Sequence, residues 1–502
     1  MEKSAEVIVA RKDRVKDQIE QCKESVGDDS MGVEHREVDG YQLDLFQVQE
    51  EPSHHGVPGD AGSGTGACEV VQASAASEPG RALTDRLMEE VCSPENLNRA
   101  YKRVKANKGA PGIDGLGVGE LLEWLETHKG VLLRSLLDGN YQPQPVRGVR
   151  IPKPGGAGMR QLGIPTVVDR LVQQAIAQVL EPILDPTFSE FSFGFRPRRS
   201  AHQALQQASA YVKAGLGIVV DIDLEKYFDR VNHDILMARL ARHVVDKRLL
   251  RIIRRFLQAG MMQDGICINR SEGTPQGGPL SPLLANLLLD DFDKELERRG
   301  HRFCRYADDC NIYVGSQAAG ERVLASVTRF LEKKLKLRVN QKKSAVARTA
   351  KRKFLGYRIL PGGRLGIAPA SLKRMKGKVQ RITRRNRGVR LERVIEELNT
   401  FLPGWVAYFR YAEGKTALRR TDEWIRRKLR CYRLKQWKRP RTIWKRLVKA
   451  GVSRREAANL ASSGKGWWRK AETPVLHIAL PNGWFEAKGL VNLTQHYLLL
   501  NH

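Results

Sequence analysis

The sequence predicts an α+β fold in which a small β-sheet lies among many helices and a mainly helical part follows it. Three observations lead to this prediction. Hydrophobic residues make up 41% of the 502 residues, which is enough to build a sizeable core. Several long segments repeat apolar residues at helical spacing, whereas only a few short runs have the composition and alternation of strands. The length suits about three domains of roughly 100–200 residues each.

The N-terminal segment is expected to differ from the rest of the chain. Residues 1–80 contain about 17 Asp and Glu against about 7 Lys and Arg, and residues 59–66 form a low-complexity run. An acidic, polar segment of this kind buries too little apolar surface to offset its ordering entropy. We therefore expect residues 1–82 to form a mostly disordered acidic extension that acts as a passive tail, with short helices near residues 7–22.

Ordered structure is expected from about residue 83. Residues 83–140 show helical spacing, interrupted at 108–115 by a loop rich in Gly and Pro. Two short β-rich segments, 302–306 and 310–314, flank a tight turn and predict a β-hairpin. The other expected elements are strands at 149–152 and 216–223 and helices at 167–184, 233–257, 281–298 and 319–335.

The charge of the chain indicates a polyanionic partner. The formal net charge is +30, and residues 371–470 alone hold about 31 Lys and Arg against about 7 Asp and Glu, with six Trp among them. Such an excess would repel itself in a compact fold unless a polyanion bound to it, although a solvated charged surface is the alternative. Apolar residues at helical spacing predict that the region beyond residue 369 is a mainly helical basic domain.

Cysteine usage and the absence of apolar targeting segments favour the cytoplasm. The seven cysteines are odd in number and include no CxxC pair, so neither a disulfide framework nor a zinc site is indicated. No run of about 18 apolar residues predicts a membrane span, and the N-terminus has no apolar signal-peptide core. We expect no membrane partner.

Two groups of carboxylates carry the predicted chemistry. Side chains alternate across a strand, so Asp221 and Asp223 in the run Val-Val-Asp-Ile-Asp share one face. Asp308 and Asp309 lie at the tight turn of the predicted hairpin. Hard cations such as Mg²⁺ prefer oxygen ligands, and two such ions about 3.5–4 Å apart can assist phosphoryl transfer. Ordinary turn chemistry is the alternative for an isolated Asp-Asp pair.

The motifs around these acids resemble, as a set, those of group II intron reverse transcriptases. Tyr-Ala-Asp-Asp at 306–309 resembles the family signature, and Asp223 with the Leu-Glu-Lys-Tyr-Phe-Asp that follows it resembles the first catalytic block. The other blocks keep the family's order from about residue 95 to 360. They are Asn-Lys-Gly-Ala-Pro-Gly-Ile-Asp-Gly (107–115), Ile-Pro-Lys (151–153), Arg160 with Leu-Gly-Ile-Pro (162–165), Ser-Phe-Gly-Phe-Arg-Pro (192–197), Gly-Thr-Pro-Gln-Gly-Gly-Pro-Leu-Ser-Pro (273–282), Asn340 with Lys343 and Ser344, and Phe-Leu-Gly-Tyr (354–357).

This resemblance implies a right-hand polymerase with helical fingers, a palm built on a small antiparallel sheet, and a helical thumb. It implies that Asp223, Asp308 and Asp309 are the catalytic carboxylates and that they hold two Mg²⁺ ions. Asp223 is preferred to Asp221 because the family has an aromatic residue five positions after its first catalytic Asp. Phe228 meets this spacing only from Asp223. Asp221 is then a solvated or supporting acid.

The same resemblance assigns residues to the incoming nucleotide. Lys153 and Arg160 match the residues of the fingers that hold the triphosphate, and Gln276 matches a residue that can hydrogen-bond the sugar or base. Phe228 would exclude a ribose 2′-hydroxyl and so select dNTPs. Without the family spacing, Lys153 and Arg160 would be read as surface cations and Phe228 as an ordinary core residue.

A general acid is also implied. Lys343 resembles the residue that protonates the departing pyrophosphate and is therefore included among the catalytic residues. Its neighbour Lys342 is the alternative.

The resemblance divides the ordered chain into three parts. Residues 83–365 would form the fingers and palm, residues 366–450 the helical thumb and maturase domain, and residues 451–502 a short C-terminal tail without the His- and Cys-rich endonuclease of many relatives. Tryptophans of the basic region could stack on unpaired bases, although core packing is their commoner role. The cations that we expect to bind RNA are Arg426, Arg427, Lys428 and Arg430.

These assignments favour an RNA-directed DNA polymerase that binds group II intron RNA, assists its splicing and copies RNA into cDNA for intron mobility. The expected partners are the intron RNA, an RNA template with a DNA or RNA primer, target DNA and dNTPs, in a bacterial cytoplasm. Two alternatives remain. One is a reverse transcriptase of the same descent recruited to defence or repair. The other is an RNA-binding splicing factor without polymerase activity, against which the presence of all three carboxylates argues.

Overall fold

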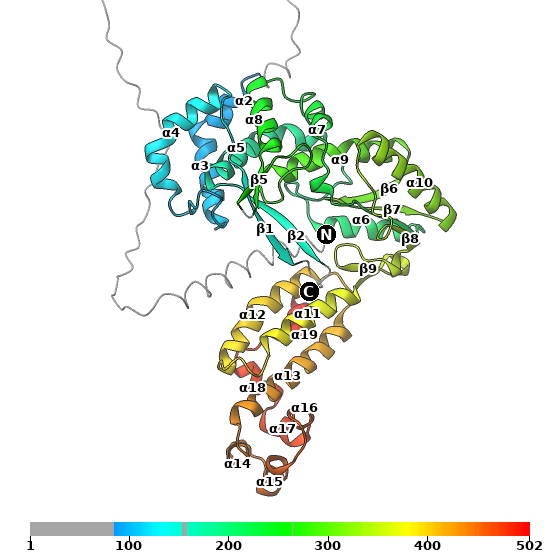
Figure 1. The fold of residues 1–502 in the computed structure, drawn as a ribbon. Coiled ribbons are helices and arrows are strands. Elements are labelled where there is room, and N and C mark those ends of the chain that lie inside the picture. Colours follow the sequence, from blue (N-terminus) through cyan, green and yellow to red (C-terminus); the bar gives the residue numbers. More distant parts are fainter. Residues whose placement is uncertain (1–84, 153–157, 264, 502) are drawn as a thin grey trace, which may run out of the picture. The chain divides into compact units, whose positions relative to one another are not determined.

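The computed structural model describes residues 85–152, 158–263 and 265–501, so the predictions for residues 1–82 and for Lys153 lie outside the described residues. The described chain forms two compact units (Figure 1). We call them the N-terminal unit and the C-terminal unit. The N-terminal unit contains the described residues up to 204 together with 220–312 and 318–346, and the C-terminal unit contains 205–219, 313–317 and the residues from 347 onward.

The N-terminal unit starts with helices packed around the buried helix α5 (Val167–Leu184). Thr166 begins α5 because its side chain accepts a hydrogen bond from the backbone N–H of Asp169. The predicted loop at 108–115 lies against this helix start, where a Cβ added to Gly112 would lie 2.6 Å from the Cα of Thr166. The neighbouring helices are α2 (Leu87–Cys92), α3 (Pro94–Ala106) and α4 (Leu121–Leu137).

A four-stranded sheet in this unit has the strand order β2-β1-β4-β5. β1 and β2 are antiparallel, and their register places Ile151 opposite Arg160. β1 also pairs in parallel with β4, Val146 opposite Met261. The strands are β1 (Val146–Pro152), β2 (Met159–Ile164), β4 (Met261–Gln263) and β5 (Ile266–Ile268).

A second four-stranded sheet has the order β6-β7-β3-β8, which makes β3 and β7 direct hydrogen-bonded neighbours. β3 ends at Asp223 and β7 begins at Asp309, so the sheet brings the two predicted groups of carboxylates onto adjacent strands. Small sheets among many helices confirm the predicted α+β class. The strands are β3 (Ile218–Asp223), β6 (Arg302–Tyr306), β7 (Asp309–Val314) and β8 (Ala345–Arg348).

One predicted helix is in fact two. The segment expected to be helical over 233–257 forms α7 (His233–Leu240) and α8 (Lys247–Gln258), so that prediction was wrong. The reason is Asp246, whose side chain accepts hydrogen bonds from the backbone N–H groups of Arg248 and Leu249 and thereby starts a new helix. The remaining elements before residue 357 are η2 (Asp185–Thr187), α6 (Ala201–Lys213), η3 (Tyr227–Asp229), α9 (Ser281–Arg298), α10 (Gln317–Lys334) and η4 (Thr349–Lys351).

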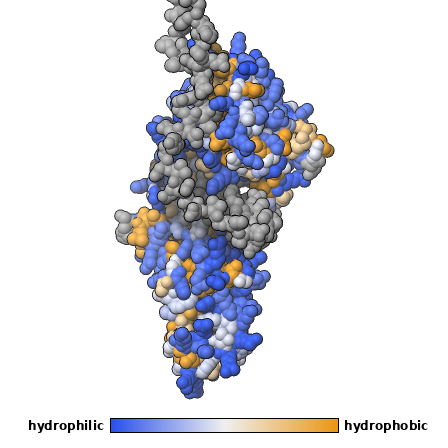
Figure 2. Space-filling view, turned by 90° about the vertical axis from the view of Figure 1, so that its left-hand side faces the viewer, coloured by the Kyte–Doolittle hydropathy of each residue, from blue (hydrophilic) through white to orange (hydrophobic). Residues whose placement is uncertain are grey.

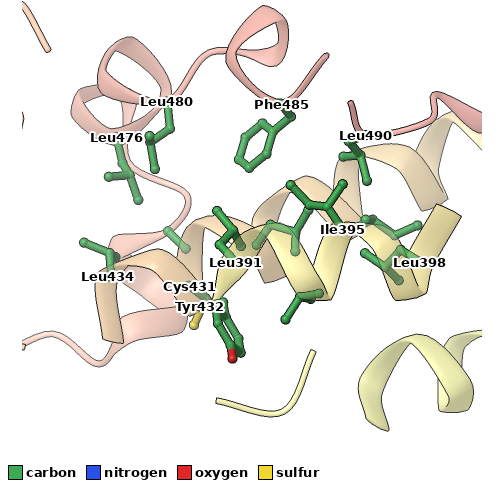
Figure 3. Packing of buried hydrophobic residues seen from close by; sticks show 14 of the residues in the cluster. Leu391, Ile395, Leu398, Cys431, Tyr432, Leu434, Leu476, Leu480, Phe485 and Leu490 are labelled. Atoms are coloured by element: carbon green, nitrogen blue, oxygen red, sulfur yellow. The ribbon is translucent and has the colours of Figure 1, made fainter. Parts of the chain in front are cut away.

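The C-terminal unit is mainly helical, with one antiparallel strand pair, β9 (Tyr357–Ile359) and β10 (Leu365–Ile367), that is joined through η5 (Pro361–Gly363). Its core joins α12 and α13 to the short helices that follow them, and Figure 3 shows Leu391 and Ile395 among the side chains at its centre. The helices are α11 (Pro369–Ile382), α12 (Leu391–Tyr408), α13 (Lys415–Trp437), α14 (Pro440–Lys449), α15 (Arg454–Ser462), α16 (Trp467–Lys470), α17 (Pro474–Ala479), α18 (Asn482–Ala487) and α19 (Leu493–Leu499).

The surface of the described chain is mostly polar. On the face drawn in Figure 2, hydrophilic residues cover most of the coloured surface and hydrophobic residues are confined to small patches. Within the residues that the structure describes, no helix has the length and apolar character needed to span a bilayer.

Candidate active site

The strand β3 orients its two carboxylates as the alternation predicts. Val220 and Ile222 are buried on one face, and Asp221 and Asp223 are half-buried on the other. The end of the strand is fixed through its backbone, because the N–H of Asp223 donates to the Oγ of Ser344 at 3.0 Å and its carbonyl accepts from the N–H of Asn340 at 2.8 Å. The motif at 340–344 and the first catalytic block therefore meet directly.

The turn that carries Asp308 and Asp309 has a strained backbone. Ala307 has a φ of 59°, in the left-handed region that non-glycine residues rarely adopt. A Cβ added to Gly194 would lie 2.3 Å from the backbone nitrogen of Ala307, so only glycine fits beside the turn. The Ser-Phe-Gly-Phe-Arg-Pro block thus packs its own backbone against the Tyr-Ala-Asp-Asp turn.

A buried ionic network holds this turn in place. Arg305 is 1% exposed and forms an ion pair with Asp293, which is 0% exposed, at 2.6 Å. Its Nη1 donates to the Oδ1 of Asn286 at 2.9 Å and to the carbonyl of Ala307 at 3.0 Å. Asn286 in turn donates to the carbonyl of Gly194 at 2.8 Å. Both side chains are fully enclosed, and burial raises the pKa of Asp293 to about 6 although the charge and hydrogen bonds of Arg305 oppose this shift.

Sequence reasoning missed these positioning residues. Arg305 stands inside the apolar strand Arg-Phe-Cys-Arg-Tyr, and Asp293 stands within the leucine-rich helix α9. The sequence signal that could have revealed Arg305 and Asp293 is a charged residue at a position expected to be buried, because buried charges are rarely found without partners.

The electrostatics of Asp309 show that the predicted carboxylates lie near one another. Burial, together with the negative charges of Asp308, Asp221 and Asp223, raises the pKa of Asp309 to about 7. In the described part of the chain, no three His, Cys, Asp or Glu side chains are already arranged as a metal-ligand set. The donor chemistry nevertheless suits a hard divalent cation, because carboxylate oxygens are the ligands that such ions prefer and β3 and β7, which carry Asp223 and Asp309, are hydrogen-bonded neighbours.

Lys343 lies beside the first of these carboxylates. Its Nζ is 3.5 Å from the Oδ1 of Asp223, and its side chain is 60% exposed. The backbone N–H of Lys343 donates to the carbonyl of Asn340, within the turn that is bonded to Asp223. This position is compatible with a proton donor at the edge of the carboxylate cluster.

Two of the residues predicted to bind the nucleotide touch each other. The Nε of Arg160 donates to the Oε1 of Gln276 at 2.6 Å, although 116 residues separate them in sequence. Burial lowers the pKa of Arg160, while the charges of Asp308 and Asp229 oppose this shift, so Arg160 also lies within the field of the catalytic turn. Gly277 has a φ of 145°, and a Cβ there would lie 2.6 Å from the carbonyl of Gly163, which explains the need for glycine beside Gln276.

Phe228 is anchored to the same loop. Its carbonyl accepts a hydrogen bond from the N–H of Thr274 at 2.7 Å, two residues before Gln276. Its ring packs edge-on against Tyr227, with 5.3 Å between centroids, and Tyr227 donates to the carbonyl of Ala285 at 2.7 Å. Phe228 itself is only half-buried, so its ring is not an ordinary core side chain.

The four cations predicted to bind RNA lie on α13 in different surroundings. Arg430 is buried at 4% exposure, donates to the carbonyl of Leu480 at 3.0 Å and lies over the ring of Phe485. Burial lowers its pKa to about 10. Because its guanidinium is enclosed within the C-terminal unit, Arg430 is less accessible to RNA than the other three cations, and its role in RNA binding stays a prediction.

The other three cations are more accessible but not equivalent. Arg427 forms an ion pair with Glu472 at 2.7 Å and lies 3.9 Å over the ring of Trp468. Lys428 lies near the rings of Trp424 and Trp468, at 5.4 and 5.5 Å. Arg426 makes no ion pair or side-chain hydrogen bond with the residues that the structure describes.

Comparison with known proteins identifies the two functional regions. Residues 151–359 match the family described as reverse transcriptase (RNA-dependent DNA polymerase), and residues 372–451 match the group II intron, maturase-specific domain. The first match contains the second sheet's β3 and its β6–β7 hairpin, and the second contains α13.

Three curated proteins show how far the similarity extends. Protein YkfC of Escherichia coli is 34% identical over 327 residues, which cover 57% of this chain and 85% of YkfC. Group II intron-encoded protein LtrA of Lactococcus lactis is 30% identical over 342 residues, 55% of this chain and 56% of LtrA. Putative COX1/OXI3 intron 1 protein of Saccharomyces cerevisiae is 30% identical over 220 residues, 43% of this chain and 26% of that protein. The matched segment therefore spans about half the length of LtrA.

The ordered motifs, the carboxylates on adjacent strands and these comparisons agree. The chain belongs to the family of group II intron reverse transcriptases and maturases, which are RNA-directed DNA polymerases dependent on a divalent metal.

Proposed function

We propose that this protein copies RNA into DNA with two Mg²⁺ ions held by Asp223, Asp308 and Asp309, and that it binds and helps to splice a group II intron RNA. The observation that carries the proposal is the electrostatic effect of Asp223 and Asp308 on Asp309, across the adjacent strands β3 and β7. Mg²⁺ ions, when bound, assist attack by the primer 3′-hydroxyl and neutralise charge on the triphosphate.

The residues of the chain position the nucleotide in this proposal. The planar guanidinium of Arg160 binds the triphosphate. Gln276, which accepts a hydrogen bond from Arg160, uses its side-chain amide to hydrogen-bond the sugar or base. Lys153, whose position is not described, is proposed as a second triphosphate contact. Phe228 excludes the ribose 2′-hydroxyl, and Lys343 gives a proton to the departing pyrophosphate.

The C-terminal unit is proposed to hold the RNA. It carries a large excess of Lys and Arg, and Arg426 and Lys428 retain access to an external phosphate backbone. The maturase-specific match at 372–451 covers these residues, and LtrA, by its description, is encoded by a group II intron. We propose that the RNA partner is the intron that encodes this protein, that it can also provide the template for cDNA synthesis on a DNA or RNA primer, and that the cDNA enters target DNA.

Primer extension tests the polymerase proposal. The wild-type protein, an RNA template with an annealed DNA primer, dNTPs and Mg²⁺ should give full-length DNA. Asp308→Asn should give none and should still bind RNA, because only a metal-binding carboxylate is lost. The matched control is Asp221→Asn, which changes an acid on the same face of β3 as Asp223 and should retain extension. Extension by Asp308→Asn would reject the metal assignment.

A splicing assay tests the maturase proposal separately. The purified protein should accelerate splicing of the intron RNA that flanks its own coding sequence, at a salt concentration where that RNA splices poorly alone. Asp308→Asn should accelerate splicing as the wild type does, because splicing depends on RNA binding and not on DNA synthesis. Absence of any acceleration by the wild-type protein would restrict its function to polymerisation.

A further inference from the structure

A small hollow in the C-terminal unit combines positive charge with aromatic surface. It lies among α13, α14, α17 and α18 (Figure 1) and has a volume of about 160 Å³. This volume is smaller than the roughly 300–1,000 Å³ of pockets for drug-sized ligands, so it suits a single planar ring. The side chains that define its chemistry are Arg433, Arg446, Lys449, Trp437, Trp484 and Leu480.

The lining of this hollow is basic and contains no acid. The lining contains three basic residues and no carboxylate. Arg446 and Lys449 are exposed and form neither ion pairs nor side-chain hydrogen bonds with the residues that the structure describes. Arg433 donates from Nη1 to Gln436 at 3.0 Å, but its Nε is shielded from water and has no hydrogen-bond partner in the described chain. The exposed side chains of Arg446 and Lys449 therefore remain available to an external anion.

The aromatic side chains give the hollow two flat walls. Trp437 and Trp484 are both half-buried, and Leu480, which Figure 3 labels, adds apolar surface. Arg433 lies over the ring of Trp484, with 6.0 Å between its Cζ and the ring centroid. Inorganic phosphate would bind to the cations but would not stack on the indole rings. A ring attached to a phosphate would use both.

The hollow lies on the same side of α13 as Arg426, one of the cations proposed to bind RNA. Arg426 and Arg433 are seven residues apart on α13, so nearly two full turns separate them and they lie on the same side of the helix. The rise between them is about 10 Å.

We propose that this hollow binds one unstacked nucleotide of a single-stranded RNA segment, and this inference rests on the proposed binding of RNA by the C-terminal unit. The base packs against Trp437 and Trp484, and a flanking phosphate is bound by the exposed side chains of Arg446 and Lys449. Single-stranded RNA is recognised by stacking on aromatic side chains and by cations along the backbone, whereas the bases of a duplex are already stacked and paired. The hollow thus selects unpaired over duplex RNA.

Binding by the full-length protein to three fluorescent probes tests this inference. The probes are a 12-nucleotide single-stranded RNA, the same strand with abasic residues, and a blunt duplex of equal length. Trp437→Leu should weaken binding to the single strand by roughly 5- to 100-fold, the range for loss of one stacked base. It should also abolish the preference for the base-containing strand over the abasic strand.

A second variant avoids the core contacts of the tryptophan. Arg446→Gln combined with Lys449→Gln changes two exposed side chains. This variant should bind the base-containing strand and the abasic strand more weakly than the wild type does, and its loss of affinity for each should be at least as large as its loss for the duplex. The matched control is Lys435→Gln combined with Lys445→Gln, which removes the same charge from exposed positions of α13 and α14 outside the hollow. Melting curves should show that the Arg446/Lys449 variant and its control remain folded.

The possible outcomes separate this inference from the proposed function. If the wild type binds none of the RNAs, the proposed function fails and the inference fails with it. Suppose instead that the wild type binds RNA. If the Arg446/Lys449 variant binds RNA as tightly as its control, and Trp437→Leu still prefers the base-containing strand to the abasic strand, only the inference is overturned. Loss of binding to a poly-glutamate peptide in the Arg446/Lys449 variant, with RNA binding unchanged, would overturn it in favour of an acidic protein partner.

Discussion

Arg305 and Asp293 form a fully buried ion pair at 2.6 Å beneath the turn that carries Asp308 and Asp309. Arg305 binds both oxygens of Asp293 and uses its remaining nitrogen for Asn286 and the carbonyl of Ala307. Because Arg305 donates to the carbonyl of Ala307, which directly precedes Asp308, the pair helps to fix the backbone of the turn that carries Asp308 and Asp309.

The first prediction concerns this pair. Arg305→Lys keeps the charge but cannot reproduce the planar fork that bridges Asp293, Asn286 and Ala307. We expect kcat for nucleotide addition to fall by roughly 100-fold, the cost of about 1 Å of misplacement, with little change in the KM for dNTP. Steady-state primer extension measures both constants.

A stability control distinguishes positioning from general damage. Arg248→Lys alters another ion pair with a buried acid, Asp246, on helix α8. It should lower the melting temperature without the loss in kcat. Equal losses of kcat in the two variants at equal melting temperatures would show that Arg305 serves stability alone.

The second prediction concerns sugar selection. Phe228→Ala removes the half-buried ring beside the Gln276 loop and should lower the preference for dNTP over rNTP by at least about tenfold. Tyr227→Phe is the matched control, because it removes only the hydroxyl that bonds Ala285 and leaves the neighbouring ring in place. Competition between dNTP and rNTP in primer extension measures the ratio, and an unchanged ratio in Phe228→Ala would eliminate the proposed gate.

The third prediction separates the cations of α13. Arg426→Gln with Lys428→Gln should weaken RNA binding and reduce the slope of log affinity against log salt by about 1 to 2, because up to two phosphate contacts are lost. Arg430→Gln should instead lower the melting temperature, because Arg430 is buried and bonded to Leu480. It should leave the salt slope unchanged.

Titration of RNA binding from low to moderate salt measures this difference. If the slope falls only in Arg430→Gln, the burial-based assignment of these cations is wrong. If it falls in neither variant, α13 does not contact the phosphate backbone at these positions.

The fourth prediction concerns the pH dependence of stability. Asp169 is 1% exposed, and its burial raises its pKa to about 6, although hydrogen bonds from Thr166 and Tyr141 oppose the shift. Because the folded state favours the protonated acid, the stability from this group is complete below its ordinary pKa of 3.8 and is lost as pH rises through about 6. The full change corresponds to about 3 kcal/mol, since each unit of pKa is about 1.4 kcal/mol.

Asp169→Asn cannot ionise and should not lose this stability. The melting temperature of the variant, relative to that of the wild type, should therefore increase between pH 5 and pH 7.5. Denaturation scans at the two pH values provide the measurement. A constant or decreasing difference would mean that Asp169 stays ionised in the folded protein across this range.

Local signals explain why parts of the fold and site could be predicted. Helices α5 and α9 have the limits expected from their apolar spacing, and Thr166 supplies a recognisable cap for α5. Alternation in β3 placed Asp221 and Asp223 on one face, as the structure shows. The break between α7 and α8 was not predicted, because the apolar spacing continues past it. The break depends on one side chain, that of Asp246, which caps the start of α8.

The sequence by itself determined which carboxylates share one strand face and which lie at the neighbouring turn, because short-range periodicity fixes which side chains each strand and turn presents. Only the tertiary structure decided which charged side chains are buried in contacts within the protein. Arg426 and Arg430 look alike in a basic helix, yet Arg430 is covered by Leu480 and Phe485, about fifty residues further along the chain. Arg305 likewise acquires its role only when α9 brings Asp293 and Asn286 to it. Burial arises from contacts between distant segments, and local sequence patterns do not specify those contacts.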